Sequence, residues 1–147
     1  MSTEVHILLV DDDEIDVMAI QRAIKSHELN LPITVAKNGV EALDVLRGIN
    51  GNALLPSPYV ILLDMNMPRM NGIEFLAELR NDTRLAASVV FMLTTSSRDE
   101  DVEAAYHYNV AGFINKEQVG TKYSTLLEML TSYCGLVIQP NIPPPSL

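Results

Sequence analysis

Four short runs of hydrophobic residues recur along the chain, and each of them ends abruptly in polar side chains. They cover residues 6–10, 59–63, 89–93 and 111–115. Apolar runs of this length, without regular polar alternation, are typical of strands that are buried on both faces of a parallel sheet. A fifth segment, residues 32–36, supplies the remaining predicted strand.

Between these segments, hydrophobic residues recur at the spacing of one helical face. The predicted helices cover residues 15–24, 38–46, 73–79, about 98–108 and about 121–134. Strand and helix thus alternate five times, which implies an α/β fold with a parallel sheet covered by helices on both faces. Right-handed crossovers favour a flavodoxin-like, doubly wound sheet with five helices and the strand order 2-1-3-4-5.

Chemically useful side chains gather where the predicted strands end. The first strand leads into three aspartates at 11–13, and the third leads into Asp64. Asp64 is followed by residues 65–72, where proline, asparagine and glycine predict a turn. The last two strands lead into Thr94 and Lys116. Because reactive groups in open parallel sheets collect beyond the carboxyl ends of the strands, we expect these side chains to share one site.

Three carboxylates at this edge favour a divalent cation. Asp11, Asp12 and Asp64 would repel one another when ionised, and crowding of this kind raises a pKa. A cation relieves the repulsion, and oxygen ligands with room for water suit Mg²⁺. Thr94 offers a hydroxyl donor, and Lys116 offers a positive charge for a phosphoryl oxygen. Asp64 is then the attacking carboxylate, which would give an aspartyl phosphate.

Each of these residues also has an ordinary structural explanation. Asp64 could cap the turn that follows it, and Thr94 could cap the next helix. Lys116 could be a surface lysine, Phe113 could simply pack in the core, and the acidic residues 11–14 could form a solvated turn. Only the combination favours a phosphoryl-accepting site.

Composition and charge narrow the classes of protein. A length of 147 residues, 48% of them hydrophobic and 20% charged, predicts a single globular domain. The hydrophobic runs fall well short of the roughly 20 residues that span a membrane. The N-terminus lacks the features of a secretion signal, and one cysteine, Cys134, excludes an internal disulfide, so we expect a cytoplasmic protein. The net charge of −9 argues against direct nucleic-acid binding.

Four motifs occur in an ordered series: LLVDDDEID, LLDMNMPRMNG, MLTTSS and GFINK. Together they resemble the receiver domains of two-component response regulators, over nearly all of the chain from Val5 to Cys134. The resemblance implies a receiver domain at residues 4–134 and a C-terminal extension at residues 135–147. It also implies the strand order given above, a sensor histidine kinase as partner, and phosphorylation that depends on Mg²⁺.

The resemblance assigns roles to the acidic residues. It implies that Asp64 is the phosphoacceptor and that Asp11 and Asp12 are the acidic pair. It further implies that Asp12 and Asp64 bind Mg²⁺ directly, with the backbone carbonyl of Asn66 as a third protein ligand. This assignment agrees with the roles inferred from the residues alone.

The resemblance also assigns roles to residues that would contact the phosphoryl group or respond to it. It implies that Thr94 and Lys116 contact this group and that Phe113 is the aromatic residue of the switch. Thr95 lies where a small side chain leaves access to the phosphoryl site open. Glu117 departs from the family, which usually has proline after the lysine, and a cis peptide at a non-proline residue costs about 2.5–4 kcal/mol.

The loop at residues 48–58 is longer than in most members of the family. Together with the short tail, it is similar to the small regulators that serve bacterial phytochrome histidine kinases. The resemblance therefore points to a single-domain regulator of this kind.

Two other functions are compatible with parts of the sequence. A phosphatase of the haloacid dehalogenase type also uses an aspartate at the end of a strand with Mg²⁺, but it typically needs a second aspartate two residues later. That position is Asn66, which cannot shuttle a proton. A DNA-binding regulator would need a further domain, and the segment after Cys134 is too short for a helix-turn-helix. We therefore expect a switch that is not an enzyme, with output through protein contacts.

The last predicted helix carries more hydrophobic residues than one buried face needs. Leu126, Leu127, Met129, Leu130 and Tyr133 form a broad apolar side, followed by the apolar residues 136–138. They could cover an edge of the sheet within one monomer. An exposed patch of this kind more often marks a partner surface, so we predict a two-fold homodimer through the fourth and fifth predicted helices.

Overall fold

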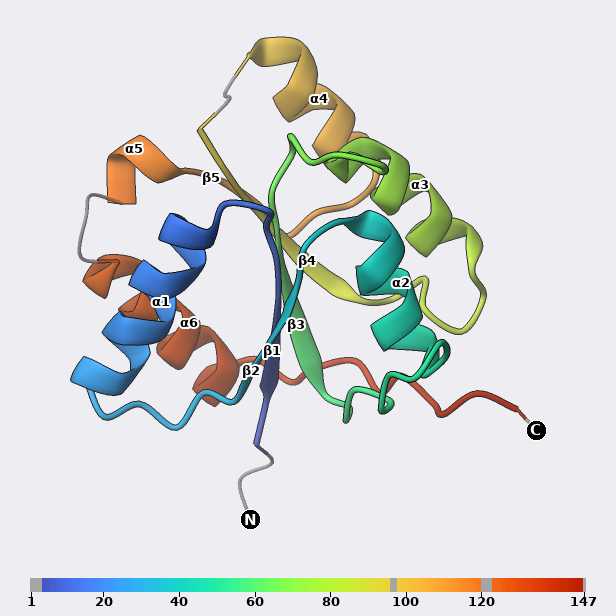
Figure 1. The fold of residues 1–147 in the computed structure, drawn as a ribbon, viewed down its shortest axis with the longest axis horizontal. Helices are drawn as coiled ribbons and strands as arrows, with labels where there is room; N and C mark the ends of the chain where they lie inside the picture. Colours follow the sequence, from blue (N-terminus) through green and yellow to red (C-terminus); the bar gives the residue numbers. More distant parts are fainter. Residues whose placement is uncertain (1–3, 96–97, 120–122, 147) are drawn as a thin grey trace.

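The computed structural model describes residues 4–95, 98–119 and 123–146, and its centre is a single sheet (Figure 1). The five strands are β1 (His6–Val10), β2 (Ile33–Ala36), β3 (Tyr59–Leu63), β4 (Val89–Thr94) and β5 (Gly112–Asn115). They lie in the order β2-β1-β3-β4-β5, and every neighbouring pair is parallel. The predicted fold class and strand order are confirmed.

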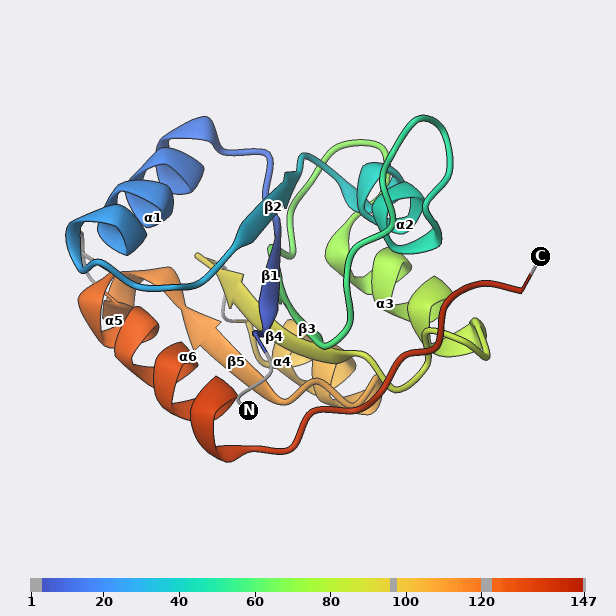
Figure 2. The ribbon, with the colours of Figure 1, turned by 90° about the horizontal axis from the view of Figure 1, so that it is seen from below.

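The helices lie in two layers, one on each face of the sheet. They are α1 (Glu14–Ser26), α2 (Gly39–Arg47), α3 (Gly72–Asn81), α4 (Asp99–His107), α5 (Lys116–Val119) and α6 (Ser124–Leu136). Figures 1 and 2 show α1 and α6 on one face and α2 and α3 on the other, with α4 beside α3. The predicted helices are confirmed, and α5 is an additional turn of four residues. The predicted start of the last helix, near Thr121, lies outside the described residues.

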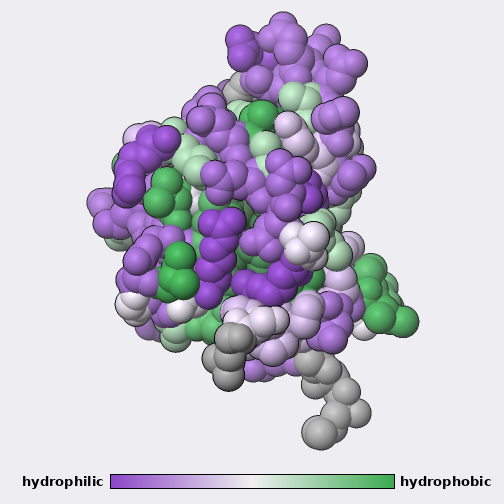
Figure 3. All heavy atoms as spheres, turned by 90° about the vertical axis from the view of Figure 1, so that its right-hand side faces the viewer, coloured by the Kyte–Doolittle hydropathy of each residue, from purple (hydrophilic) through white to green (hydrophobic). Residues whose placement is uncertain are grey.

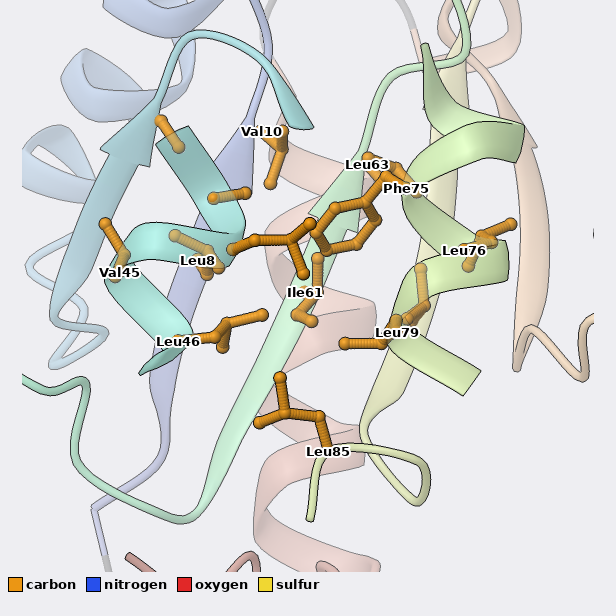
Figure 4. Close-up of a cluster of buried hydrophobic side chains, with 14 of the residues drawn as sticks. Leu8, Val10, Val45, Leu46, Ile61, Leu63, Phe75, Leu76, Leu79 and Leu85 are labelled. Carbon is orange, nitrogen blue, oxygen red and sulfur yellow. The ribbon is translucent and has the colours of Figure 1, made fainter. Parts of the chain in front are cut away.

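Side chains of the strands point alternately into two hydrophobic clusters. On one face, Leu8 and Ile61 pack with Phe75 of α3 (Figure 4). On the other face, Ile7 and Leu62 lie in the cluster that contains the buried leucines of α6. All five residues of β3 are buried, as its unbroken apolar run predicts. Burial of each Leu or Ile side chain stabilises the folded state by about 1.5–3 kcal/mol. The strand ends are therefore held by a well-packed core.

Local hydrogen bonds fix two of the loops at the carboxyl edge of the sheet. The carboxylate of Asp13 accepts hydrogen bonds from the backbone N–H groups of Ile15 and Asp16 and thereby caps α1. At the start of α3, Asn71 and Glu74 form a reciprocal capping box. Both helices therefore begin at defined positions beside the polar strand ends.

Arg80, in the last turn of α3, binds two connections at the opposite edge of the sheet. Its guanidinium donates hydrogen bonds to the backbone carbonyls of Ala86 and Ser88, which lie just before β4. It also donates to the carbonyls of Tyr108 and Asn109, between α4 and β5, at 2.7 and 3.1 Å. One side chain thus joins α3 to the segments that enter β4 and β5.

The segment after α6 crosses beneath the sheet from the α6 layer to the α2–α3 layer (Figure 2). Near its end, the side chain of Ile142 is buried in the cluster around α2 and α3. Its backbone N–H donates to Ser57 Oγ, and Arg84 donates to the carbonyls of Leu46 and Pro143. The end of the chain is therefore packed onto the domain.

Hydrophobic side chains at the surface are unevenly distributed. The face that carries α3 and α4 is mainly hydrophilic, with hydrophobic side chains in small separate groups (Figure 3). At the end of α6, by contrast, Leu136 and Ile138 are 84% and 96% exposed. Val137 between them is also exposed, so residues 136–138 form an exposed apolar segment at the end of α6.

Candidate functional site

Three carboxylates meet where β1 and β3 end. Val10 of β1 pairs with Leu63 of β3, so the residues that follow, Asp11 and Asp64, leave the sheet side by side. Oxygen atoms of Asp11, Asp12 and Asp64 all lie within 4.8 Å of one another. Asp11 and Asp64 are buried, whereas Asp12 is exposed. The predicted carboxylate cluster is present, with one side open to solvent.

The turn after Asp64 packs closely against the cluster. The backbone N–H of Asn66 approaches Asp64 Oδ1 at 3.4 Å, and the backbone N–H of Gly72 donates to the carbonyl of Met65. A Cβ atom on Gly72 would lie only 2.7 Å from the carbonyl oxygen of Asp64. Glycine is therefore required here for α3 to begin so near the cluster.

Lys116, the first residue of α5, reaches into the cluster from the end of β5. Its Nζ donates to Asp11 Oδ2 at 2.8 Å and to Asp16 Oδ2 at 2.7 Å, and it lies 3.8 Å from Asp64 Oδ2. The lysine is buried, so its ammonium is not a surface charge. The prediction that Lys116 joins the carboxylates is confirmed by these distances.

Burial and charge act in opposite directions on this group of side chains. Burial raises the pKa of Asp11 to about 6, although the hydrogen bond from Lys116 opposes the rise. Burial alone would lower the pKa of Lys116, but its hydrogen bonds to Asp11 and Asp16 outweigh this and raise it. The lysine therefore remains an ammonium, while Asp11 is a carboxylate that gains from a nearby cation.

The remaining predicted residues lie on β4 and β5. Thr94 is the last residue of β4, is fully buried, and pairs with Asn115 of β5. Phe113 of β5 is half-buried against the cluster around α2 and α3. Thr95 is exposed at the strand end. Thr94 and Lys116 thus come from adjacent strand ends, whereas Phe113 lies within β5, two residues before its end.

The peptide between Lys116 and Glu117 is trans in the structure. A cis peptide occurs at Ser57–Pro58 instead. The backbone N–H of Glu117 donates to Asn115 Oδ1 at 2.8 Å, and α5 begins directly at Lys116. The glutamate thus fits this loop without a cis bond.

Two residues of this region were not predicted from the sequence. Asp16, on the first turn of α1, accepts the hydrogen bond from Lys116 described above, and its other oxygen accepts one from the hydroxyl of Tyr123 at 3.2 Å. The acidic spacing from Asp11 to Asp16 is a weak signal for the first of them, because acids are common in the first turn of any helix. We find no sequence signal that marks Tyr123.

Comparison with protein families decides the identity of the domain. Residues 7–129 match the response regulator receiver domain. The chain belongs to this family. The pocket formed by Asp11, Asp12, Asp64 and Lys116 is accordingly the acidic phosphorylation pocket of a receiver domain in two-component signalling.

Several relatives of this receiver domain cover most of its length. The chain is 32% identical to the response regulator Rcp1 of Synechocystis sp. over 112 residues, which is 76% of each chain. It is similar in structure to the phosphorylated cyanobacterial phytochrome response regulator RcpA, with a TM-score of 0.83, 27% identity, and coverage of 95% of this chain and 100% of RcpA. A two-component response regulator from Legionella pneumophila has 36% identity and a TM-score of 0.74, with coverage of 88% and 99%.

The carboxylate cluster of this receiver domain fits a hard divalent cation. Its donor atoms are oxygens, they lie close enough to share one ion, and the open side at Asp12 leaves room for water. A Mn²⁺-bound form of Rcp1 has the same fold, with a TM-score of 0.81, 26% identity, and coverage of 93% of this chain and 99% of Rcp1. Within the described part of the chain, we find no helix with the length and hydrophobicity needed to cross a membrane.

Proposed function

We propose that Asp64 is the phosphoacceptor of this receiver domain. The observation that carries the proposal is the meeting of Asp11, Asp12 and Asp64 within 4.8 Å, with the Lys116 ammonium 3.8 Å from Asp64. An oxygen of Asp64 would attack the phosphorus of a phosphohistidine. The new O–P bond forms as the N–P bond breaks, and the imidazole nitrogen leaves.

The residues around Asp64 have separate tasks in this proposal. Asp11, Asp12 and Asp64, with the backbone carbonyl of Asn66, would hold a Mg²⁺ ion, which would neutralise charge on the transferred group. Lys116 and the hydroxyl of Thr94 would contact phosphoryl oxygens. The exposed Thr95 side chain is small, which leaves the approach to Asp64 open.

We propose that the chain acts as a switch whose chemistry is limited to gaining and losing its own phosphoryl group. A phosphatase of the haloacid dehalogenase type would place an acid/base carboxyl two residues after the nucleophile. Here the side chain at that position is the amide of Asn66, which does not exchange a proton in this way. The site therefore lacks the general acid that hydrolysis of an external phosphate ester would need at this position.

The output of the switch would pass through Thr94 and Phe113. A phosphoryl oxygen that draws the Thr94 hydroxyl inward would leave space into which the ring of Phe113 can turn. Both residues lie on neighbouring strands, and Phe113 is only half-buried, so it can move without opening the core. The surface formed by α4, β5 and α6 would change as a consequence.

The phosphoryl donor would be a sensor histidine kinase, and the similarity to Rcp1 and RcpA supports a kinase of the phytochrome type. On α1, the hydrophobic side chains of Ile15 and Met18 are 79% and 55% exposed beside the acidic pocket. These side chains offer an apolar contact to a protein that approaches Asp64. The domain at residues 4–134 would carry this function, with the cytoplasm as its site of action.

We also propose a two-fold homodimer that involves α4 and α6. Leu136, Val137 and Ile138 are 84%, 42% and 96% exposed, which supports a contact with another protein better than a role in covering the sheet of the same monomer. These residues belong to the extension at 135–147. A two-fold axis would bury the same patch on both copies.

Treatment with acetyl phosphate tests the central proposal. With Mg²⁺ present, the intact mass of the wild-type chain should increase by one phosphate. Asp64→Asn should show no increase, and a chelator should abolish it in the wild type. Asp13→Asn is a matched control, because Asp13 caps α1 and lies outside the carboxylate cluster. A phosphate adduct that persists in Asp64→Asn would overturn the assignment.

A further inference from the structure

A fourth carboxylate, that of Asp16, holds Lys116 from outside the metal-binding cluster. Its Oδ2 accepts a hydrogen bond from Lys116 Nζ at 2.7 Å, as short as the bond from Lys116 to Asp11 at 2.8 Å. Its Oδ1 accepts a hydrogen bond from the hydroxyl of Tyr123 at 3.2 Å. A continuous chain of contacts therefore runs from Tyr123 through Asp16 and Lys116 to Asp11.

We infer that Asp16 is the positioning residue for Lys116 and that Tyr123 fixes the orientation of its carboxylate. The inference rests on the proposed function, because it concerns how the lysine is presented to a phosphoryl group on Asp64. An ammonium has three N–H donors. Two are taken by Asp11 and Asp16, and the 3.8 Å between Nζ and Asp64 Oδ2 is too long for a hydrogen bond. The third N–H is available for an oxygen of a group bound to Asp64.

Asp16 would hold Lys116 in place even when a cation occupies the carboxylate cluster that includes Asp11. Among the described residues, the cluster whose oxygens lie within 4.8 Å of one another consists of Asp11, Asp12 and Asp64. A cation in that cluster would be bound partly by the charge of Asp11 and would weaken the hydrogen bond from Lys116 to Asp11. Asp16 lies outside the cluster, so its bond to Lys116 would not compete with a bound cation. The lysine would otherwise lose its fixed position at the moment it is needed.

Tyr123 makes the carboxylate of Asp16 a rigid support. The tyrosine is 5% exposed, packs in the hydrophobic cluster that joins α1 and α6 to the sheet, and immediately precedes α6. Burial and the nearby charge of Asp16 raise the pKa of Tyr123 to about 12, so its hydroxyl remains a donor. The two oxygens of Asp16 thus have separate partners, Tyr123 for Oδ1 and Lys116 for Oδ2.

Two variants and one matched control test the inference. Asp16→Asn keeps an acceptor but removes the charge, and Tyr123→Phe keeps the ring but removes the hydroxyl. Glu14→Gln removes a charge from the same turn of α1 at an exposed side chain. Nuclear magnetic resonance titrations would measure the affinity for Mg²⁺ alone, and then for beryllofluoride at saturating Mg²⁺.

Loss of a charge-assisted hydrogen bond to the lysine should weaken beryllofluoride binding about tenfold in Asp16→Asn. Tyr123→Phe should weaken it about threefold, because a neutral hydrogen bond is lost one step away. Glu14→Gln should match the wild type within about twofold, since an exposed charge is screened. The Mg²⁺ affinities of Asp16→Asn and Glu14→Gln should agree, because both remove one charge near the cluster and neither removes a ligand.

The possible results separate this inference from the proposed function. A wild-type chain that does not bind beryllofluoride would overturn both. If the wild type binds, equal or tighter binding by Asp16→Asn would overturn the positioning role alone. A Mg²⁺ affinity that falls in Asp16→Asn as far as the beryllofluoride affinity would also overturn it, since the effect would then be a general one of charge. Unaltered binding in Tyr123→Phe would overturn the part given to Tyr123.

Discussion

The backbone N–H of Ile142 donates a hydrogen bond to Ser57 Oγ at 3.2 Å and so fastens the end of the chain to the loop before β3. The side chain of Ile142 is buried in the same cluster as Leu46 and Leu55. Part of the hydrophobic core is therefore supplied by two irregular segments, one of them C-terminal to the last helix.

We expect Ile142→Ala to lower the free energy of unfolding by about 2 kcal/mol, because a buried Ile is truncated at a site that can partly collapse. Urea denaturation monitored by circular dichroism would measure this change. Ile49→Ala is the matched control, since Ile49 is 45% exposed and its truncation should cost less than about 1 kcal/mol. Equal losses in the two variants would show that Ile142 does not belong to the folded core in solution.

Thr94→Ala should leave phosphorylation of Asp64 largely intact but abolish most of the response at the surface. In the proposed switch, the Thr94 hydroxyl would couple the phosphoryl group to the ring of Phe113, and this hydroxyl is missing in the variant. Amide chemical shifts of α4, β5 and α6, recorded with and without beryllofluoride and Mg²⁺, would measure the response.

Thr95→Ala removes the neighbouring, exposed hydroxyl and should respond like the wild type. Chemical-shift changes of the same size in Thr94→Ala and wild type would contradict the role given to Thr94.

The raised pKa of Asp11 makes stability depend on pH. Burial raises this pKa from 3.8 to about 6 in the folded chain. Between these values the folded state binds more protons than the unfolded state, so the stability from this group is complete below about pH 4 and declines until about pH 6. The total loss is roughly 3 kcal/mol at most.

Asp11→Asn should remove this decline, and saturating Mg²⁺ should offset it in the wild type above pH 6. Urea denaturation at a series of pH values would measure both effects. Asp12→Asn removes a carboxylate charge from the same cluster at an exposed position and should keep the decline. A flat profile in the wild type would show that Asp11 is not perturbed in solution.

The exposed end of α6 should hold two copies of the chain together. Light scattering at micromolar concentration should give the mass of a dimer for the full chain. A double variant, Leu136→Ser with Ile138→Ser, should shift the population to monomer, because two exposed hydrophobic side chains are replaced and the packing of Ile142 is left intact. A chain that ends at Gly135 should do the same.

Ile49→Ser is again the control, because it removes an exposed hydrophobic side chain away from α6. A monomeric wild type, with or without beryllofluoride, would rule out the dimer. A double variant that dimerises as well as the wild type would rule out this surface.

The strands and the acidic cluster were predictable because local patterns determine them. The unbroken apolar run before Asp64 is typical of a strand buried on both faces, and the parallel order brings its end beside Asp11. The partners of Lys116 depend instead on where α1 and α6 pack against the sheet. Asp16 is 100 residues from Lys116 in the chain, and no local pattern encodes their contact.

The packing of the C-terminal segment was not predictable for a different reason. A helix or strand repeats its buried positions, and the repetition is what a sequence pattern detects. In this segment a single residue, Ile142, is buried between exposed neighbours and prolines. Its backbone N–H is bound by Ser57, and the carbonyl of the next residue, Pro143, is bound by Arg84. Both partners belong to loops that are distant in the sequence.

The hydrogen bonds of Arg80 determine what kind of motion the domain can make. Because Arg80 binds the carbonyls of Tyr108 and Asn109, the carboxyl end of α4 is pinned to α3. In the described part of the chain, the hydrogen bonds of Arg80 reach α4 only beyond its carboxyl end, while its amino end at Asp99 lies on the side of the sheet where β4 ends (Figure 1). A disturbance at Thr94 would therefore move α4 least at its carboxyl end, where Arg80 binds. Displacement would increase along the helix and be greatest near Asp99, on the same side of the molecule as the pocket that receives the phosphoryl group.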